Sequence, residues 1–497
     1  MLLLSRALSD SPHYKWWVFG AVGLGSFTGV MSMGMINVAL PTIAGHFQTD
    51  LPTVQWVVIA QTLTVSALLL PMGRLSDMVG RKQVYIVGLL LLMGASVFAA
   101  SSTSVLMLVA SRVIQGTGAA MTQGVGMAMV TSIFPEEERG KGLGTHMSVI
   151  GAGGMAGPVI GGLLVSVLGW RWVFLINLPM ATIALVGALL LVDSKLFFRE
   201  RRGTRFDWPG AALSTAALVT FLMLMTNGYR LGWTSPLILL AGATVIALVA
   251  AFIVWELRAP APMLDLGLFR RRVFSLGVSA SFMSFLSTGS IRFMMPFYLQ
   301  GVLGYHPGQV GLIMLPTAIT MTIMGPIAGR LSDRYGYRAF NVAGLLIASI
   351  GIFTISRVSE ATPLPVIIGA LVVQSAGTGL FGSPNSSSIF SAAEGNRHGV
   401  VSALLSLVRN SANVTSIAVA TAVVTATMVS AGYAPDLGNV SGGEDMGLLK
   451  SFVSGMNTLY LGMGCLLLVG AVASFFKGPA ATGISPRRGA ERVRAGN

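Results

Sequence analysis

The chain has 497 residues, of which 53% are hydrophobic and only 10% are charged, and its formal net charge is +14. Soluble domains carry about 25% charged residues, so this composition excludes an ordinary soluble enzyme or binding domain and indicates a membrane protein. The positive charge does not indicate nucleic-acid binding, because the cations lie in short segments between apolar runs and not on one polar domain.

Fourteen apolar segments follow one another along the chain, each close to the roughly 20 helical residues that cross a bilayer core. We expect spans near residues 15–38, 53–73, 83–101, 105–131, 142–166, 171–193, 208–229, 236–256, 273–300, 308–328, 338–356, 364–388, 399–429 and 453–476. No clean small-residue cleavage site follows the first apolar run, so we expect that span to be retained. The single cysteine, Cys465, excludes an intramolecular disulfide.

Basic segments divide these spans into three groups. We predict a first six-span bundle over 1–196, basic loops with two extra spans over 197–270, a second six-span bundle over 271–478, and a disordered tail over 479–497. Within the second basic loop, apolar side chains alternate with charges, which is typical of a short segment lying in the membrane interface. The apolar positions are Leu264, Leu266, Leu268 and Phe269.

The lysines and arginines are distributed unevenly between the two sides of the predicted spans. If both termini lie on one side, 25 of the 32 cations fall on that side, four fall on the other, and Arg112, Arg292 and Arg409 fall within spans. Cytoplasmic segments are enriched in cations. We therefore expect a multi-pass protein of the plasma membrane (inner membrane), with both termini in the cytoplasm.

A five-residue sequence, Gly-Arg-Leu-Ser-Asp, occurs at 73–77 and again at 329–333 between apolar runs. A shift of 256 residues also places Gly80 on Gly336 and Lys82 on Arg338, so a helix-loop-helix unit has been duplicated. We expect tight turns at the glycines and ion pairs from Asp77 to Arg81 or Arg139 that close one face of the molecule; a static turn with solvated charges is the alternative. The predicted gate consists of Gly73, Arg74, Asp77, Gly80, Arg81, Arg139, Gly329, Arg330, Asp333 and Arg334.

Small residues recur every four positions in the fifth span, at Gly153, Gly157 and Gly161. They share one helical face, and Pro158 beside them can bend the helix. Together with Gly162, they predict a contact surface between the two halves that opens and closes. The alternative is ordinary small-residue packing between helices.

Arg112 lies within the fourth span, where an ionisable side chain marks function by default. The alternative is a side chain that extends to the outer interface from near the start of its span. The corresponding position in the second half is Leu371, so this cation was not duplicated.

Three motifs in corresponding spans resemble those of the major facilitator superfamily, and in particular its fourteen-span drug:proton antiporter branch (EmrB/QacA type). They are the Gly73–Lys82 segment, Arg112-Val-Ile-Gln115-Gly116, and the glycine-rich Gly153–Gly162 segment. The resemblance covers nearly the whole chain. It implies an all-α membrane protein with the major facilitator fold, that is, 14 transmembrane helices in two six-helix halves plus two extra helices. It also implies a monomeric exporter that is not an enzyme and needs no cofactor, and a link between Arg112 and proton coupling.

One departure from the family pattern changes the expected chemistry. Family members usually carry an aspartate five residues before the asparagine that corresponds to Asn37, and here that residue is Ser32. All eighteen acids fall in loops, tails or span ends, so we expect no carboxylate near mid-membrane to carry a proton or to balance an organic cation. The remaining coupling candidates are Arg112, His46 with Asp50 one turn away at the outer mouth, and His146; transport without protons is the alternative.

Arg292 is the residue that we expect to bind an anionic group, unless it lies at the end of its span. The predicted substrate cavity consists of Ser32, Met35, Asn37, Gln61, Gln115, Arg292, Met295, Gln374, Asn385 and Arg409. We therefore predict an alternating-access exporter of hydrophobic or amphiphilic compounds, with membrane lipids and, if coupling occurs, protons as further partners. The alternatives are a transporter of lipids or lipid-like anions that uses Arg292, and a non-transporting receptor or scaffold. No metal-ligand or nucleophile-base cluster is present that would indicate an enzyme.

Overall fold

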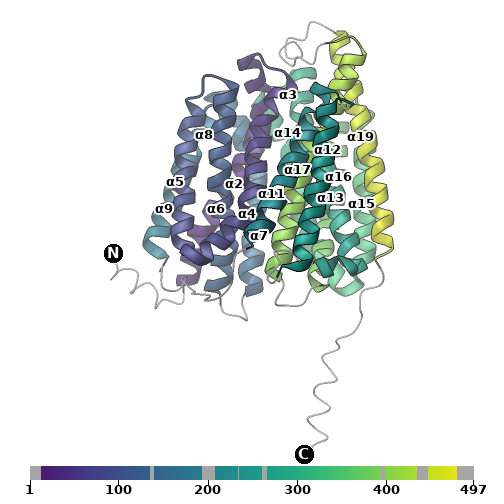
Figure 1. The fold of residues 1–497 in the computed structure, drawn as a ribbon. Helices are drawn as coiled ribbons and strands as arrows, with labels where there is room; N and C mark the ends of the chain where they lie inside the picture. The colour runs from purple at the N-terminus through teal and green to yellow at the C-terminus, as the bar shows by residue number, and fades with distance from the viewer. Residues whose placement is uncertain are drawn as a thin grey trace, which may run out of the picture.

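The computed structural model describes residues 13–134, 139–192, 207–232, 234–259, 266–392, 398–433 and 446–477. Within these ranges the chain forms helices and no strands, and the long helices run side by side (Figure 1). The N-terminal half contains α2 (Tyr14–Phe47), α3 (Leu51–Val54), α4 (Trp56–Val79), α5 (Arg81–Ala100), α6 (Val105–Ile133), α7 (Arg139–Val167), α8 (Trp172–Leu175) and α9 (Asn177–Leu191). The extra pair is α11 (Trp208–Leu231) and α12 (Pro236–Arg258). The C-terminal half contains η2 (Leu266–Arg270), α13 (Arg272–Phe297), η3 (Tyr298–Val302), α14 (Pro307–Tyr335), α15 (Tyr337–Ile355), α16 (Leu364–Ser391), α17 (His398–Ser430) and α19 (Met446–Phe475).

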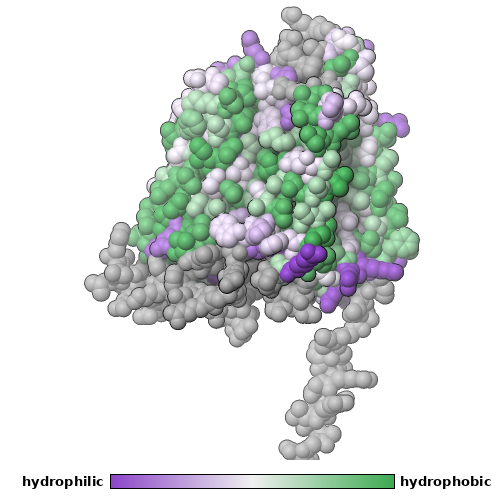
Figure 2. All heavy atoms as spheres, viewed as in Figure 1, coloured by the Kyte–Doolittle hydropathy of each residue, from purple (hydrophilic) through white to green (hydrophobic). Residues whose placement is uncertain are grey.

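All fourteen predicted spans contain a long helix. In the described part of the chain, thirteen segments are long and apolar enough to cross a membrane, and α7 supplies the fourteenth with a shorter apolar stretch, Gly151–Val167. Figure 2 shows hydrophobic residues along the sides of the helices and hydrophilic ones mainly toward the two ends. α12 is the extreme case, because only 6% of its apolar window is buried inside the protein. Such a surface is stable only against lipid, which confirms a multi-pass membrane protein.

The start of the first helix, α2, and the end of the last helix, α19, lie on the same face of the bundle (Figure 1). We call this the terminal face and the opposite one the distal face. The extra pair is attached through α11, which packs against α4 of the first half and α17 of the second. The Thr215 hydroxyl of α11 donates to the Ala67 carbonyl of α4 at 3.1 Å. α11 therefore contacts both halves, while α12 lies at the periphery.

The duplicated pentapeptide lies inside helices, which corrects the expectation of a turn at Gly73. α4 continues to Val79 and α14 to Tyr335, and the chain turns only at Gly80 and Gly336, with φ of +116° and +85°. These positive φ values suit glycine, and the charged residues before each turn continue the helix beyond the predicted spans 53–73 and 308–328. Both turns therefore have a glycine at the same position of the repeat, as the 256-residue shift predicts.

The cations after each turn also have related roles. Lys82 donates to the carbonyl oxygens of Leu189 at 3.1 Å and Val192 at 2.6 Å, where α9 ends. Arg338, its counterpart, lies 4.2 Å from the centre of the Phe475 ring at the end of α19. Each cation thus binds the end of the last helix in its own half, where helix carbonyls and aromatic faces attract positive charge.

The hydrophobic core shows that the two halves meet on the distal side. One buried cluster joins them, and its members from the first half, such as Met35, Val57 and Phe174, all lie in distal parts of their helices. Toward the terminal face, a second cluster around Tyr85 contains residues of the first half only, and a third around Phe274 contains residues of the second half only. The halves are therefore packed together distally and are separate near the terminal face.

Candidate functional site: a polar site between the two halves

Solvent-accessible residues recur every three or four positions along α2 and along α13, from the terminal face into the bundle. On α2 they run from Trp17 through Phe27 to Met33, after which 34–41 are all buried. On α13 they run from Ser279 to Arg292, after which 293–299 are all buried. Since a buried cluster joins the halves on the distal side and the clusters near the terminal face each belong to one half, we infer that these rows line an opening between the halves that ends at Met33 and Arg292. We call the two rows of accessible residues the central stripes.

Arg292 is exposed although the residues on both sides of it, Ile291 and Phe293, are buried. It lies five residues before the end of α13, which continues into η3, so it is not at the helix end. Arg409 of α17 is partly exposed, and α17 is the helix that packs most extensively against α13. The two arginines therefore form a positive site at the closed end of the opening.

The packing of α13 on α17 explains why these arginines come together. A Cβ built on Gly289 would lie 3.2 Å from the side-chain oxygen of Asn413 and would overlap Ser416. The absence of a side chain on Gly289 thus lets the two helices approach closely, one turn from Arg292 and one turn from Arg409. The described acids are far from this site in the sequence and lie at helix ends or in loops, for example Asp50, Asp207 and Glu360. None of the described carboxylates is on the central stripes.

The other eight residues predicted for the cavity are packed inside the protein, which corrects that part of the prediction. In this structure Ser32, Met35, Asn37, Gln61, Gln115, Met295, Gln374 and Asn385 are all buried. They lie on the sides of their helices that face neighbouring helices of the same half or the distal seam. A polar side chain in a membrane helix can form hydrogen bonds with water in a cavity or with a neighbouring helix. The orientation of the helix about its axis determines which of the two occurs.

Three of these buried polar side chains join helices within one half. The Asn177 amide of α9 donates to the Ser32 hydroxyl of α2 at 3.2 Å, so the residue that replaces the expected aspartate is part of a helix-helix contact. The Gln374 amide of α16 donates to Thr288 of α13 at 3.2 Å. The Asn385 amide of α16 donates to Ser281 of α13 at 2.7 Å. Both bonds in the second half fix α16 against α13.

Arg112 is fully buried and binds neutral oxygens from two helices. Its Nε donates to the Val57 carbonyl at 2.9 Å, and its terminal nitrogens donate to the side-chain oxygens of Gln61 and Gln115. The Gln115 amide in turn donates to the Ser96 hydroxyl at 2.9 Å. Gln61 and Gln115 thus supply the acceptors that a buried guanidinium needs.

This geometry rules out the alternative in which Arg112 extends to the outer interface. The guanidinium lies 5.7 Å from the centre of the Phe174 ring, in the interior of the first half. None of its bonds in the described part of the chain is to a carboxylate. Arg112 therefore joins α4, α6 and, through Gln115, α5, and it does not line the opening.

The glycine face of α7 packs on α2 of the same half, which corrects the prediction that it lies between the halves. A Cβ built on Gly157 would lie 2.7 Å from the Met31 carbonyl oxygen, and one on Gly161 would lie 2.6 Å from the Met35 Cα atom. Gly153 approaches α2 in the same way. The four-residue period predicted a close helix contact correctly, but it does not specify which helix is the neighbour.

The neighbouring positions of α7 form the contact between the halves. The Pro158 carbonyl oxygen would lie 2.5 Å from a Cβ on Gly311 of α14, and Gly162 meets the Pro307 backbone. On the adjacent helices, the Gln300 amide donates to the Val38 carbonyl at 2.9 Å. These contacts are distal, so the structure is closed at the distal face and open toward the terminal face.

The predicted gate lies at the terminal face, and much of it falls outside the residues whose side chains are described. This applies to Gly73, Arg74, Asp77, Arg139 and Asp333. Of the others, Gly80 forms the turn, Gly329 lies next to Ser383 of α16, and Arg81 is engaged in an interaction. Arg330 and Arg334 are exposed, and Arg334 lies 5.5 Å from the centre of the Tyr335 ring. The ion pairs expected from Asp77 remain a prediction.

The histidine candidates are not on the central stripes. His46 packs against Phe47 and Trp170 at the distal face. Asp50 accepts from the Thr53 amide at 3.1 Å and starts α3, so it lies beyond the end of α2 and not one turn along the same helix. His146 is buried in α7, with its ring centre 6.3 Å from that of Phe19 and its Nδ1 atom unbonded.

Sequence reasoning missed Lys477, which follows α19 at the terminal face. Its ammonium is buried and donates to the Asn385 side-chain oxygen and, at 3.4 Å, to the Ser388 hydroxyl. Burial lowers the pKa of this amine to about 7. A signal was present in the sequence, because Lys477 is the last charged residue before the glycine- and arginine-rich tail and adjoins the apolar Phe475–Phe476 pair.

Comparison with known proteins supports one family. The pattern of the Major Facilitator Superfamily matches residues 22–417. The riboflavin transporter RibZ of Clostridioides difficile (strain 630) is 32% identical over 401 residues, which cover 80% of this chain and 85% of that protein. The multidrug resistance protein Stp of Mycobacterium tuberculosis (strain CDC 1551 / Oshkosh) is 30% identical over 390 residues, which cover 78% of this chain and 72% of that protein.

Solved structures agree on the fold. A bacterial homolog of the human lysosomal transporter Spinster, in an inward-facing and unoccupied conformation, superposes with a TM-score of 0.68 at 16% identity, over 94% of this chain and 98% of that one. Together with the fourteen helices in two halves and an extra pair, these matches identify the chain as a membrane transport protein and not an enzyme. It belongs to the Major Facilitator Superfamily.

Proposed function

We propose that this chain is an alternating-access exporter of neutral or anionic hydrophobic and amphiphilic compounds. It would work as a monomer in the plasma membrane (inner membrane), with the terminal face in the cytoplasm. The observation that supports this proposal is the pair Arg292 and Arg409 at the closed end of the central stripes, with no described carboxylate beside them. Relatives named as a riboflavin transporter and as a multidrug resistance protein are consistent with substrates of this kind.

Electrostatics favours an anionic group over a cation at this site. The two arginines repel each other, so an anion between them removes that repulsion and gains charge-assisted hydrogen bonds. A permanent organic cation would add a third positive charge to the same place. Phe27, Phe282 and Phe285 are partly exposed on the central stripes and offer apolar contact to the rest of an amphiphile.

The transport cycle would exchange the distal closure for a terminal one. In the described conformation the halves are held together by Gln300 bound to Val38 and by the Pro158–Gly311 approach. Rocking of the halves would break these contacts and bring the terminal ends of the helices together, where the predicted gate residues lie. Substrate release at the distal face then follows from loss of the enclosed site.

Transport assays in proteoliposomes test the substrate class. The probes are a fluorescent long-chain fatty acid as the anionic amphiphile, riboflavin as a neutral compound, and ethidium as a permanent cation. We expect transport of the first two and none of ethidium. Arg292→Ala should reduce transport of the fatty acid by about 10-fold or more, and Arg292→Lys should restore most of it, because one charged hydrogen bond contributes about 1.5–3 kcal/mol.

Arg357→Ala is the matched control, because Arg357 is exposed in a distal loop and far from the central stripes. It should transport all probes as the unchanged protein does. Efficient ethidium transport, or fatty-acid transport that survives Arg292→Ala, would contradict the proposed substrate class. Flipping of labelled phospholipids that depends on Arg292 in the same way would instead support the second candidate function, a transporter of lipids or lipid-like anions.

Proton coupling has less support, because no described carboxylate lies on the central stripes and Arg112 is enclosed by neutral partners. We propose that the substrate gradient drives transport without a proton. A pH-sensitive dye inside the vesicles tests this: substrate addition should leave the internal pH unchanged. A substrate-dependent pH change that is lost in Arg112→Gln or His146→Gln would show instead that one of these residues takes part in coupling.

A further inference from the structure

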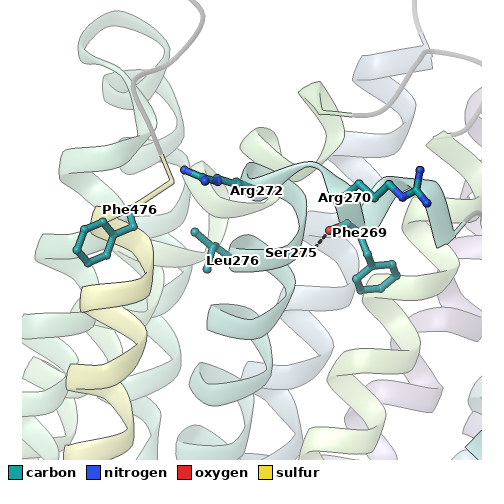
Figure 3. Close-up of a pocket in the computed structure, with 6 residues that line it drawn as sticks. All are labelled: Phe269, Arg270, Arg272, Ser275, Leu276 and Phe476. Carbon is teal, nitrogen blue, oxygen red and sulfur yellow. Dashed lines mark hydrogen bonds between the residues drawn. The ribbon is translucent and has the colours of Figure 1, made fainter.

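A pocket of about 400 Å³ lies at the terminal face, away from the central stripes. It is formed where η2 leads into α13 and where α19 ends (Figure 3). Its lining consists of Phe269, Arg270, Arg272, Ser275, Leu276 and Phe476. These residues come from segments about 200 positions apart in the sequence, so the pocket exists only in the folded protein.

The cations of the pocket are available to a ligand. Arg270 and Arg272 are exposed, and neither has a hydrogen-bond or ion-pair partner in the described part of the chain. Arg271 between them is used structurally, because its guanidinium donates to the Ala392 carbonyl at the end of α16 at 2.6 Å. This bond holds the turn so that its two neighbours project on either side (Figure 3).

The turn is also anchored by packing. Leu268 is buried in the cluster around Phe274, and the Phe269 and Phe274 rings meet edge to face with centres 5.2 Å apart. The Ser275 hydroxyl donates to the Phe269 carbonyl at 2.6 Å. The backbone that carries the two free arginines is therefore held in place by the fold before any ligand binds, which lowers part of the entropic cost of binding.

The pocket has a charged layer and an apolar layer. In Figure 3 the guanidinium groups of Arg270 and Arg272 lie at the level where the helices end, and Phe269, Leu276 and Phe476 lie beside or below them along the helices. Phe476 is 66% exposed, although it directly follows a helix long enough to span the membrane. The order of these layers is that of phosphate groups and acyl chains at a bilayer surface.

We propose that this pocket binds the headgroup of an anionic phospholipid. The phosphate lies against the Arg272 guanidinium, on the side of the turn where Leu276 and Phe476 lie, and the first part of an acyl chain lies against these two apolar side chains (Figure 3). Arg270, on the other side of the turn, adds to the positive potential that attracts the headgroup. A zwitterionic lipid binds less well, because its own cationic group faces the two guanidinium groups. The site is separate from the proposed substrate site, since Leu276, its lining residue furthest along α13, is 16 residues before Arg292, which is about 24 Å along the helix.

A second pocket on the distal face provides a natural comparison. It has a volume of about 490 Å³ and also contains two cations, Arg357 and Lys450, but its lining includes the carboxylate of Glu360. That acid opposes an anionic headgroup. Lipid selectivity should therefore depend on the terminal pocket and not on the number of exposed cations alone.

The test is lipid binding to the purified full-length protein by native mass spectrometry. Phosphatidylglycerol and phosphatidylcholine with the same acyl chains are the two probes. We expect the unchanged protein to prefer phosphatidylglycerol, and R270Q/R272Q to lose this preference by about 10-fold or more, since each arginine at a membrane surface contributes about 1 kcal/mol. R357Q/K450Q should keep it. Equal selectivity in R270Q/R272Q and the unchanged protein would overturn the proposal.

Two further measurements identify the ligand and the place. A phosphatidylglycerol with a photoreactive acyl chain should label the peptides that contain Leu276 and Phe476, and labelling elsewhere only would overturn the assignment. Inorganic phosphate at millimolar concentration should not displace the lipid. Displacement would show that the site takes a free phosphate and not a lipid. Both arginines are exposed, so size-exclusion profiles of the variants should match that of the unchanged protein.

Discussion

Replacement of Lys477 by methionine should change how the stability of this protein depends on pH. The lysine is 2% exposed, and its ammonium donates only to the neutral oxygens of Asn385 and Ser388 among the described residues. Burial lowers its pKa to about 7 from the ordinary value of 10.5. Methionine keeps the apolar part of the side chain and removes the titrating group.

The sign and size of the change in stability follow from the difference between the pKa of Lys477 in the folded protein and its pKa in the unfolded chain. Between pH 7 and pH 10.5 the unfolded chain still holds the lysine proton while the folded protein has released it, so the free energy of unfolding rises with pH. A separation of this size corresponds to about 5 kcal/mol over the whole range, because one pKa unit is about 1.4 kcal/mol. Between pH 7 and pH 9 the gain is about 2 kcal/mol.

The measurement is the free energy of unfolding in mixed detergent micelles at pH 7, 8 and 9. The unchanged protein should gain about 2 kcal/mol relative to Lys477→Met across this range. Lys450→Met is the matched control, because Lys450 lies near the other end of α19 and is exposed. The rise of the difference with pH should be clearly larger for Lys477→Met than for Lys450→Met. If the Lys477→Met difference stays constant from pH 7 to pH 9, the amine is not buried in the folded protein and the reasoning is refuted.

Three further perturbations test the packing. Gly157→Val should destabilise the first half by about 2–3 kcal/mol through overlap with the α2 backbone, whereas Gly151→Ala, with open space around it, should change unfolding little; equal effects would contradict the described α2–α7 contact. Gln61→Leu removes an acceptor from a buried guanidinium and should cost about 1.5–3 kcal/mol, measured by the same unfolding assay; no loss would mean that this bond is absent. Ser166→Cys with Gly308→Cys, in a cysteine-free background, should cross-link under mild oxidation and stop transport, because a Cβ on Gly308 would lie 3.1 Å from the Ser166 hydroxyl; cross-linked protein that still transports would show that the distal seam does not open.

The glycine-rich stretch of α7 shows both the reach and the limit of sequence reasoning. Its four-residue period predicted a face where another backbone approaches closely, and the structure contains such a face. The period does not name the partner helix, so the predicted contact between the halves was wrong for Gly153, Gly157 and Gly161. Only the intervening positions, Pro158 and Gly162, meet the second half.

The polar residues of the spans show the same limit in another form. Arg112, Gln61 and Gln115 were interpreted as separate functional candidates, and they form one buried network. In contrast, Arg292 and Arg409 have similar sequence surroundings of apolar and small polar residues, and both are accessible. The composition around a residue does not show whether its side chain is buried or accessible. Successive residues of a helix are about 100° apart around its axis, so neighbours in the sequence can face solvent or another helix.

The sequence by itself determined the class of protein, the fourteen spans, the two halves and the turns at Gly80 and Gly336. These features depend on local properties: the length of an apolar run, the freedom of glycine and the repetition of a motif. The tertiary structure decided which face is open, which arginines are accessible and how Lys477 and the terminal pocket are built. These features depend on contacts between segments far apart in the chain, and the packing of helices against one another, not the sequence of any one helix, determines them.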